Sequence, residues 1–400
     1  IQLTQAGQLL LSEKRIHETF TRQLLKFQLP SPYHTQSTAI HFSVKPYLEL
    51  LRLIADIGYI SKTEIALFFI QMTNFEFYDL IKTKIKLFRK NRKDHKGSYK
   101  IYVNKCFENE INNIYAEEIS SKNLKTRESS ENSLDKFMKT KMSNMKDYAD
   151  AFFRYIRSTE LVTLDRKTFR LVVSPNKTEE VDFLLKNIDR KPKCFKSNDE
   201  FKNYLFNPYS IELLSDDRDL LIKKIKKIDS AYESANEDIE ELKDILEKKQ
   251  EMIKFEIISN KKNELKDIKK IDDIIDIFEK IKSKDVPDAP LFLEWNVWRS
   301  FVMLNHAKRI DGNFIMDMDG MPLNTAPGGK ADIEIEFEDF GLISEVTLSG
   351  GETQFKMEAD SVPRHYGQFK SNLNKDAYCI FIAPKISTGT KSFFYGLNRI

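Results

Sequence analysis

Glycine is distributed very unevenly along this chain of 400 residues. Three of its 13 glycines, Gly7, Gly58 and Gly97, precede residue 312, and the other ten lie at or after that position. Glycine supplies the positive backbone angles that turns need, and it weakens the interior of a helix. We therefore expect the first three quarters of the chain to be largely helical. The last quarter should be a turn-rich mixture of strands and helices.

Charge is also unevenly placed. The chain has a net charge of +3, but the residues from Val286 onward hold 15 acidic and 11 basic side chains, so the residues before them carry +7. Within that basic part, IKTKIKLFRKNRKDHKGSYK (81–100) contains nine Lys or Arg and one Asp. A basic front and an acidic back fit a protein that binds a polyanion in one part and a metal in another. A solvated lysine-rich loop explains segment 81–100 equally well.

Several classes of protein are disfavoured. The three cysteines lie far apart without a CxxC motif, so neither a zinc site nor a disulfide framework is indicated, and a reducing cytoplasm is the expected location. The uncharged, mostly apolar stretch from Ile65 to Phe75 is far shorter than the roughly 20 residues of a membrane span. We therefore expect no membrane partner. Because the chain opens at Ile1, we also expect the start of the protein to lie upstream.

The length predicts two to four domains. Residues 1–40 are interpreted as the end of an N-terminal domain whose start is missing, and 41–180 as a winged-helix-like DNA-binding domain. Residues 181–285 are interpreted as a helical linker, and 286–400 as a small C-terminal domain. The predicted fold class is accordingly multidomain: a mostly α N-terminal part, a helical linker and a C-terminal α/β domain.

The winged-helix prediction depends on three neighbouring patterns. PYLELLRLIADIG is an apolar helix with Gly58 as its C-cap, and YISKTEIALFFI follows with Ser61 and Glu64 spaced as a capping box. Downstream, DYADAFFRYIR predicts a third helix, and LVTL-DRKT-FRLVV predicts a hairpin where a wing would lie. Helix-turn-helix shapes also occur as plain structural modules, so DNA contact and a purely structural role remain open from the pattern alone.

The linker prediction depends on a segment from Tyr209 to Val286 that contains neither glycine nor proline. Apolar residues recur at heptad-like steps, but Lys249 interrupts them after two heptads, so a long coiled coil is not expected. We expect packed helices with breaks near Ser234 and at Ser259–Asn260. DVPDAP (285–290) should end the segment.

The last domain contains an unusual set of acidic residues. In ADIEIEFED, alternation puts Asp332, Glu334, Glu336 and Glu338 on one face of a strand. Glu345 stands alone in the otherwise apolar strand LISEVTLS. Either these acids form the solvated face of an edge strand, or Asp332 and Glu345 meet and hold a cation. The order helix, strand, strand, helix, strand is that of the PD-(D/E)xK nuclease core, in which an Asp and a Glu on adjacent strands bind Mg²⁺ through hard oxygen ligands.

The block ADIEIEFEDFGLISEVTLSGGETQFKMEADSVPRHY resembles the catalytic region of AlwI-type type IIS restriction endonucleases, which include the large subunits of heterodimeric nicking enzymes. Further resemblance lies in LTQAGQLL, LLKFQLPSP, IGYISKTEIALFF, YIRSTELVTL, FLEWNVWRSF and YCIFIAP, so it extends over the whole chain. EVTLSGGETQFKMEADSVPRH is the specific part. The helical segments are weaker support. The resemblance implies that residues 1–40 are the end of an N-terminal DNA-recognition domain, and that 286–400 is a PD-(D/E)xK-like catalytic domain.

The resemblance implies roles for individual residues. Asp332 matches the first metal-binding acid of the family, and Glu345, 13 positions later, matches the second. Glu294 on the preceding helix and Glu358 in QFKME match two further acids of the active site. Thr347 stands where the motif usually has lysine, so transition-state charge would depend on the metal or on Lys356. Ala331 replaces the motif's proline, which does no chemistry.

Other residues are weaker candidates. His365, in RHY, is a candidate for orienting water or contacting phosphate, although a lone histidine is more often a packed or surface residue. Trp295 and Tyr366 are expected to be core residues. The lysines of 82–100 are candidates for phosphate contact, but the sequence does not identify DNA-binding residues.

Together these observations predict a Mg²⁺-dependent type IIS restriction endonuclease of the prokaryotic cytoplasm, or its strand-nicking large subunit. It would bind double-stranded DNA and cut outside the recognition site. One catalytic site cuts one strand, so cutting both would need a second copy or a small catalytic subunit. The alternative is a non-catalytic winged-helix DNA-binding protein with a helical dimerisation arm.

Overall fold

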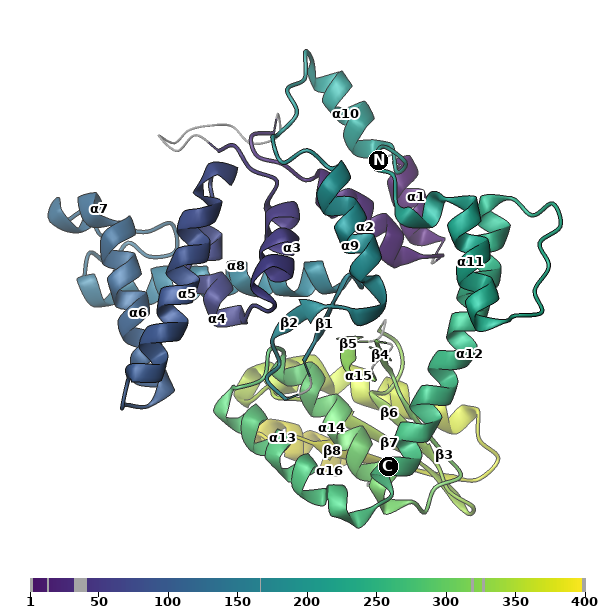
Figure 1. The fold of residues 1–400 in the computed structure, drawn as a ribbon. Helices are drawn as coiled ribbons and strands as arrows, with labels where there is room; N and C mark the ends of the chain where they lie inside the picture. The colour runs from purple at the N-terminus through teal and green to yellow at the C-terminus, as the bar shows by residue number, and fades with distance from the viewer. Residues whose placement is uncertain are drawn as a thin grey trace. The chain divides into compact units, whose positions relative to one another are not determined.

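The computed structural model describes residues 3–12, 14–31, 42–165, 167–317, 320–325 and 328–397. The chain divides into two compact units, Ile1–Lys243 and Asp244–Ile400, and we describe each by itself (Figure 1). Whether the segments 1–40, 41–180, 181–285 and 286–400 are separate domains stays a prediction. In the described part of the chain, no helix is long and apolar enough to cross a membrane.

The first unit is mainly helical, as the scarcity of glycine predicts. It contains one small antiparallel pair of strands, β1 (Val162–Leu164) and β2 (Leu171–Val173). Its helices are α1 (Gln5–Leu11), α2 (Ile16–Lys26), α3 (Pro46–Ile57), α4 (Lys62–Leu67), α5 (Tyr78–Asp94), α6 (Tyr99–Ile114), α7 (Ala116–Ser120), α8 (Leu134–Arg157), α9 (Thr178–Asn187), α10 (Asn198–Phe206) and α11 (Arg218–Ile228), together with the start of α12 (Ile239–Leu265).

The helix caps predicted around α3 and α4 are present. Gly58 follows α3 with a φ of 82°, a conformation that side chains with a Cβ rarely adopt. Ser61 and Glu64 form the capping box at the start of α4. However, α4 is shorter than the expected helix: it ends at Leu67 and gives way to a 3₁₀ turn, and it is mostly buried. Helix α8 packs against it.

The expected hairpin follows α8 directly. Strands β1 and β2 pair from Val162↔Val173 to Leu164↔Leu171. Ile60, between α3 and α4, bridges Leu171 from the other side, with backbone bonds of 2.9 and 2.8 Å. Helices α5, α6 and α7 are inserted between α4 and α8 in the chain order (Figure 1).

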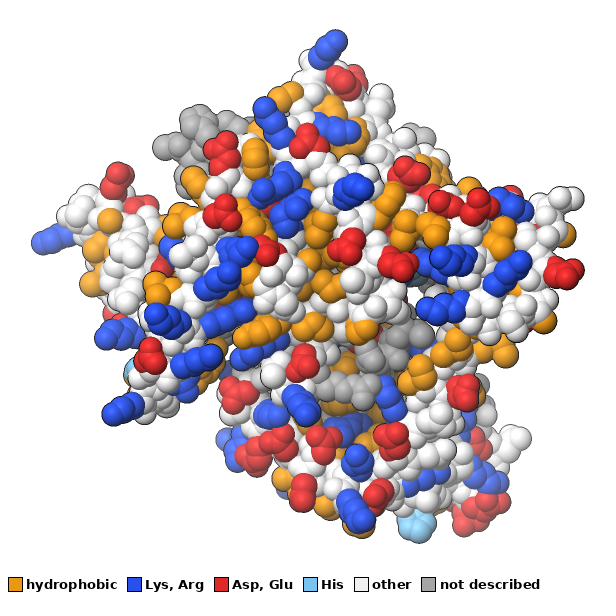
Figure 2. Space-filling view, in the orientation of Figure 1, with side chains coloured by type: hydrophobic (Ala, Val, Ile, Leu, Met, Phe, Trp, Pro, Cys, Tyr) orange, Lys and Arg blue, Asp and Glu red, His pale blue; other side chains and the backbone are white. Residues whose placement is uncertain are grey.

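The basic segment 81–100 is a helix and not a loop over most of its length, because it forms α5 and the start of α6. Part of its charge is used inside the fold: Lys84 pairs with Glu110 at 2.8 Å, and Lys82 pairs with Asp56. Other side chains of the segment are exposed, among them Lys86 and Lys90. On the face drawn in Figure 2, Lys and Arg side chains gather where Figure 1 places α4 and α5.

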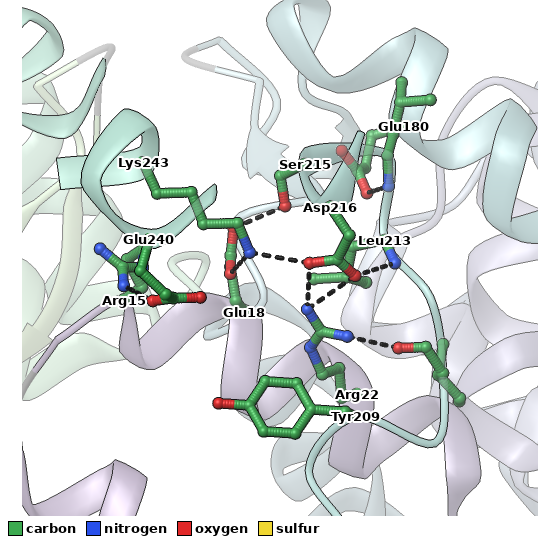
Figure 3. A network of polar contacts seen from close by, with 12 residues as sticks. Arg15, Glu18, Arg22, Glu180, Tyr209, Leu213, Ser215, Asp216, Glu240 and Lys243 are labelled. Atoms are coloured by element: carbon green, nitrogen blue, oxygen red, sulfur yellow. Dashed lines mark hydrogen bonds and ion pairs between the residues drawn. The ribbon is translucent and has the colours of Figure 1, made fainter. Parts of the chain in front are cut away.

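A second set of charges in the first unit is buried and fully paired (Figure 3). Lys243 of α12, 4% exposed, donates to Glu18 at 2.9 Å and to Asp216 at 2.8 Å. Arg22 donates to both oxygens of Asp216, at 2.7 and 2.9 Å. The Ser215 hydroxyl donates to Glu18 at 2.6 Å. We call these five residues the Lys243 network. It joins α2 and the start of α12 to the turn before α11.

The predicted helix breaks between residues 209 and 286 are correct in part. Helix α11 ends at Ile228 and α12 begins at Ile239, so a break lies around Ser234 as expected. The break expected at Ser259–Asn260 is wrong, because α12 runs through both residues to Leu265. Serine and asparagine are tolerated at a solvent-facing helical position when no glycine or proline interrupts the hydrogen bonds. The helix is broken only near Asp267, whose side chain caps the following turn.

The second unit is a small α/β structure. Its helices are the rest of α12, α13 (Ile271–Ser283), α14 (Ala289–Leu304), α15 (Gly351–Ser371) and α16 (Thr388–Leu397). Its strands are β3 (Arg309–Gly312), β4 (Phe314–Met316), β5 (Pro322–Thr325), β6 (Ile333–Glu336), β7 (Phe340–Val346) and β8 (Asp376–Ile382). The helix, strand, strand, helix, strand order expected from the sequence is therefore present, as α14, β6, β7, α15 and β8.

The main sheet has the order β3-β6-β7-β8. Strands β3, β6 and β7 are antiparallel neighbours, whereas β8 runs parallel to β7 after the crossover through α15. Helix α15 packs against both β7 and β8. Gly341 in β7 allows this close packing, because a Cβ there would lie 2.8 Å from the Phe369 ring of α15.

Candidate active site

Asp332 and Glu345 lie side by side at one end of strands β6 and β7. The register pairs Ile333 with Ser344, and one further step sets Asp332 opposite Glu345. The Asp332 carboxylate accepts a hydrogen bond of 2.7 Å from the backbone N–H of Val346. In return, the backbone N–H of Asp332 donates to the Glu345 carboxylate. These two bonds hold both carboxylates at the same end of the strand pair.

Glu294 and Glu358 approach this pair from two helices. Glu294 lies in α14, where its neighbours from Leu291 to Arg299 are buried, and its own exposure is only 9%. Glu358 lies in α15 and is bonded by the hydroxyls of Thr347 and Ser361. We call Glu294, Asp332, Glu345 and Glu358 the carboxylate cluster. All four candidates from the sequence are its members, so the structure brings them together.

The electrostatics show that the members of the cluster affect one another. Burial, and then the charge of Asp332, raises the pKa of Glu294 to about 8. Burial also raises the pKa of Asp332 to about 6, against the hydrogen bond from Val346. Burial, followed by the charges of Asp332 and Glu358, raises the pKa of Glu345 to about 9. Burial raises the pKa of Glu358 as well. The cluster is thus a set of carboxyl groups that resist ionising together.

No Lys or Arg among the described residues forms an ion pair with the cluster. The other acids of the β6 segment differ. Glu336 pairs with Lys375 at 3.0 Å, which lowers the pKa of Glu336, and Glu338 pairs with Lys308 at 2.8 Å. Strand β6 is also flanked by β3 and β7, so it is not an edge strand. The interpretation of these acids as the solvated face of an edge strand is therefore wrong for Asp332.

His365 of α15 belongs to the site, although its sequence context favoured a packed or surface role. Its Nδ1 lies 2.8 Å from Oε1 of Glu345, and its side chain is buried. Burial lowers the pKa of His365, so the ring is neutral at pH 7. Its Nε2 has no hydrogen-bond partner among the described residues. In the sequence, the only indication of this proximity is the spacing of seven residues, or two helical turns, between Glu358 and His365.

The position where the motif usually has lysine is filled by Thr347, which bonds to Glu358 and accepts from the backbone of Ser349 at 3.1 Å. Lys356 does not supply the missing charge in this structure. It is exposed and pairs with Glu352 at 2.9 Å along the surface of α15. Trp295 and Tyr366 pack as expected: Trp295 is buried, and the Tyr366 hydroxyl donates to the Ala377 carbonyl at 2.9 Å.

Sequence reasoning missed Gln354, the side chain that fixes the segment between β7 and α15. Gln354 is fully buried. Its amide nitrogen donates to the carbonyls of Ser349 and Lys385 at 2.8 and 3.1 Å, and its oxygen accepts from Ser387 at 2.7 Å. A single side chain thereby ties α15 to the segments that follow β7 and β8. A glutamine in a helical sequence gives no signal of such a role.

Comparison with known proteins assigns this arrangement to a family. The family model described as AlwI restriction endonuclease matches residues 1–397. The chain belongs to the AlwI restriction endonuclease family. The resemblance seen in the sequence is confirmed. No curated protein gave a significant match.

Among solved structures, the chain is similar to the small subunit of the heterodimeric restriction endonuclease R.BspD6I. The identity is 35% over 30% of this chain and 62% of that subunit, with a TM-score of 0.28. The match therefore covers less than two thirds of the subunit, and the family assignment depends on the family model.

The chemistry of the carboxylate cluster fits the divalent cation that restriction endonucleases generally use. Carboxylate oxygens are the hard ligands that Mg²⁺ prefers. The raised pKa values show that no side-chain cation stabilises the ionised carboxylates, as a bound metal ion would. Among the described residues, no group of three or more His, Cys, Asp or Glu side chains already has the geometry of a metal site. The fit therefore lies in the donor chemistry and not in a preformed coordination shell.

Proposed function

We propose that this restriction endonuclease is a type IIS enzyme, or its strand-nicking large subunit, with a PD-(D/E)xK-like catalytic domain in the second unit. Asp332 and Glu345 would hold Mg²⁺, and Glu294 and Glu358 would complete the acidic site. The observation that carries the proposal is a set of four buried or half-buried carboxylates with raised pKa values and without a Lys or Arg partner among the described residues. When bound, the ion would polarise the scissile phosphate and lower the pKa of the attacking water.

The protein residues have distinct tasks in this mechanism. The backbone N–H of Val346 orients Asp332, and the backbone N–H of Asp332 orients Glu345. With Glu345 ionised, the neutral His365 donates its Nδ1–H to that carboxylate and fixes its rotamer. Glu294, with a pKa of about 8, can keep a proton at neutral pH until a cation offsets the neighbouring charge.

DNA recognition would lie in the first unit. We propose that α3, the bridge at Ile60, α4, α8 and the β1-β2 hairpin form a winged helix, with α5–α7 inserted before α8. This assignment is supported by the pairing of β2 with both β1 and Ile60, because a three-stranded wing has such a central strand. In it, α8 would be the helix presented to the major groove. Helix α12 connects the recognition part to the catalytic part, so the cut would fall outside the recognised site.

One carboxylate cluster would hydrolyse one strand at a time. Double-strand cleavage would therefore require a second copy of the chain or a small catalytic subunit. A winged-helix DNA-binding protein without catalysis would gain nothing from four uncompensated carboxylates that are buried or half-buried, because their ionised forms destabilise the fold. The family match also favours the nuclease over this alternative.

The test is cleavage of supercoiled plasmid in the presence and absence of Mg²⁺. We expect open circles or linear DNA only with the metal, and a loss of at least about 100-fold in Asp332→Asn and Glu345→Gln. Glu336→Gln is the matched control, because Glu336 lies on the same strand but pairs with Lys375. A gel shift should show nearly unchanged DNA binding in all variants. Normal cutting by Asp332→Asn would refute the assignment of the site, and sequencing of the cut ends would report site, offset and strand together.

A further inference from the structure

Two arginines of the first unit lie over the same aromatic ring. The guanidinium carbon of Arg89, in α5, is 3.8 Å from the centroid of the Tyr59 ring. That of Arg170, beside β2, is 4.5 Å from the same centroid. Tyr59 itself precedes Ile60, the residue that bridges β2. The pair thus links α5 to the hairpin through one tyrosine, and the two arginines can be compared directly.

Arg89 uses its donors inside the protein. Its Nε donates to Glu64 at 2.6 Å, and its Nη2 donates to Glu64 at 3.1 Å and to the carbonyl of Tyr59 at 2.6 Å. Glu64 is buried and belongs to the capping box of α4. Arg89 is therefore neutralised by Glu64, and its role is to hold α5 against the start of α4.

The environment of Arg170 differs from that of Arg89. Within the described ranges, its guanidinium makes no side-chain hydrogen bond and no ion pair, and it lies over the Tyr59 ring. Stacking occupies the face of a guanidinium, whereas all its N–H donors point outward in the plane. Arg170 is half-buried, so the ring restricts its rotamers while its donors stay available. Such an ordered fork matches the oxygen pairs of a phosphate.

The charges around Arg170 favour an anion. Asp165, at the start of the hairpin turn, accepts a hydrogen bond of 2.7 Å from the Thr168 hydroxyl. This bond is the main cause of the lowered pKa of Asp165, and the charge of Arg170 contributes less. Arg92 donates only to backbone carbonyls, those of His95 and Gly97, so its charge remains uncompensated by these contacts. Exposed basic side chains follow on the hairpin and on α5, namely Lys167, Lys86, Lys90 and Lys93.

We propose that Arg170, stacked on Tyr59, binds a phosphate of the double-stranded DNA backbone and positions the β1-β2 hairpin on the duplex. This inference rests on the proposed function, because it assumes that the first unit binds DNA. It assigns to Arg170 a contact that fixes the register of the protein without reading bases. Arg89 on the same ring has no such role.

The experiment measures DNA affinity of the full chain by fluorescence anisotropy between about 50 and 200 mM salt, with duplexes that contain or lack the cleavage site. Arg170→Gln should weaken both duplexes alike, by about 10- to 100-fold. It should also reduce the slope of log affinity against log salt by about one. Arg170→Lys should keep the slope, because the charge remains, but lose part of the affinity, because the planar stacked fork is absent.

Two further measurements keep the outcomes distinct. Lys226→Gln, on the surface of α11, removes the same charge and should leave the slope unchanged. Melting curves should coincide for all variants, which excludes a loss of affinity through unfolding. If the wild-type chain binds DNA and Arg170→Gln has the same slope, or if Lys226→Gln reduces it equally, the inference is overturned while the proposed function stands. If the wild-type chain neither binds nor cuts DNA, both fail.

Discussion

The Lys243 network and the carboxylate cluster are two groups of buried acids with opposite surroundings. In the network, Glu18 and Asp216 surround a buried lysine and arginine (Figure 3). Burial by itself would raise the pKa of Glu18, but Lys243 and Ser215 outweigh it, so the pKa lies below its usual value. The same balance, with Arg22 as the main cation, lowers the pKa of Asp216.

In the carboxylate cluster the same desolvation meets no cation, and the pKa of every member is raised. The difference distinguishes acids that stabilise the fold from acids that are available to bind a cation. An acid with its own cation is already satisfied and stabilises what it joins. A group of acids without one stores unfavourable charge, which a bound cation can relieve. The four predictions below test this contrast, from the largest expected effect to the smallest.

Removing the cation of the network should be the most damaging change. Lys243→Met leaves Glu18 and Asp216 buried with less compensating charge, so we expect a loss of about 3–5 kcal/mol in the free energy of unfolding of the first unit. Urea unfolding followed by far-UV circular dichroism measures it. Lys227→Met, at an exposed site on α11, should change stability by less than about 0.5 kcal/mol. A fully stable Lys243→Met protein would mean that the network is dispensable.

Adding a cation to the cluster should stabilise the second unit. Both tryptophans of the chain, Trp295 and Trp298, lie in α14, so their fluorescence reports this unit alone. At a Mg²⁺ concentration of 100 times the dissociation constant, the gain is about 2.7 kcal/mol. Asp332→Asn should abolish most of this gain, whereas Glu336→Gln should keep it. Equal stabilisation of Asp332→Asn and wild type would place the ion elsewhere.

His365 should matter through Glu345 and not through stability. We expect His365→Gln to lower the rate of plasmid cleavage by about 10- to 100-fold, because partners that orient ligating carboxylates typically contribute that much. His306→Gln, an exposed histidine of the same unit, serves as the control. If raising the Mg²⁺ concentration restores the rate of His365→Gln, the histidine acts by orienting the ligand. An unchanged rate at every Mg²⁺ concentration would remove it from the site.

The pH dependence of stability should have opposite signs in the two regions, with a slope of at most about 1.4 kcal/mol per pH unit for each carboxyl group. Glu18 and Asp216 have lowered pKa values, so their contribution is complete above about pH 4.5 and is lost as the pH falls further. In metal-free protein, Glu345 has a raised pKa. Its contribution is complete below about pH 4.5 and is lost as the pH rises to about 9.

Unfolding is followed by circular dichroism and by tryptophan fluorescence at pH values across both ranges. The two signals separate the free energies of unfolding of the two units. Glu345→Gln should flatten the alkaline decline of the second unit and leave the acid limb of the first unit unchanged. An alkaline decline of the same size in Glu345→Gln would contradict the assignment of that slope to the cluster.

Local sequence signals predicted the elements well. The Ser61–Glu64 capping box, the glycine after α3 and the LVTL-DRKT-FRLVV hairpin are all present, because caps and turns depend on residues only a few positions apart. The element order of the second unit was likewise readable from apolar alternation. The break at Ser259–Asn260 failed because propensity alone does not interrupt a helix that already has its hydrogen bonds.

The sequence by itself determined which residues are acidic, which strands they lie on and the family to which the pattern belongs. Alternation along one strand could not separate Asp332 from Glu336 and Glu338, and only the family resemblance singled out Asp332. Only the tertiary structure decided that Lys375 and Lys308 neutralise the latter two while Asp332 meets Glu345, Glu294 and Glu358. The physical reason is that ionisation depends on burial and on the charges nearby in space, and these come from segments far apart in the chain.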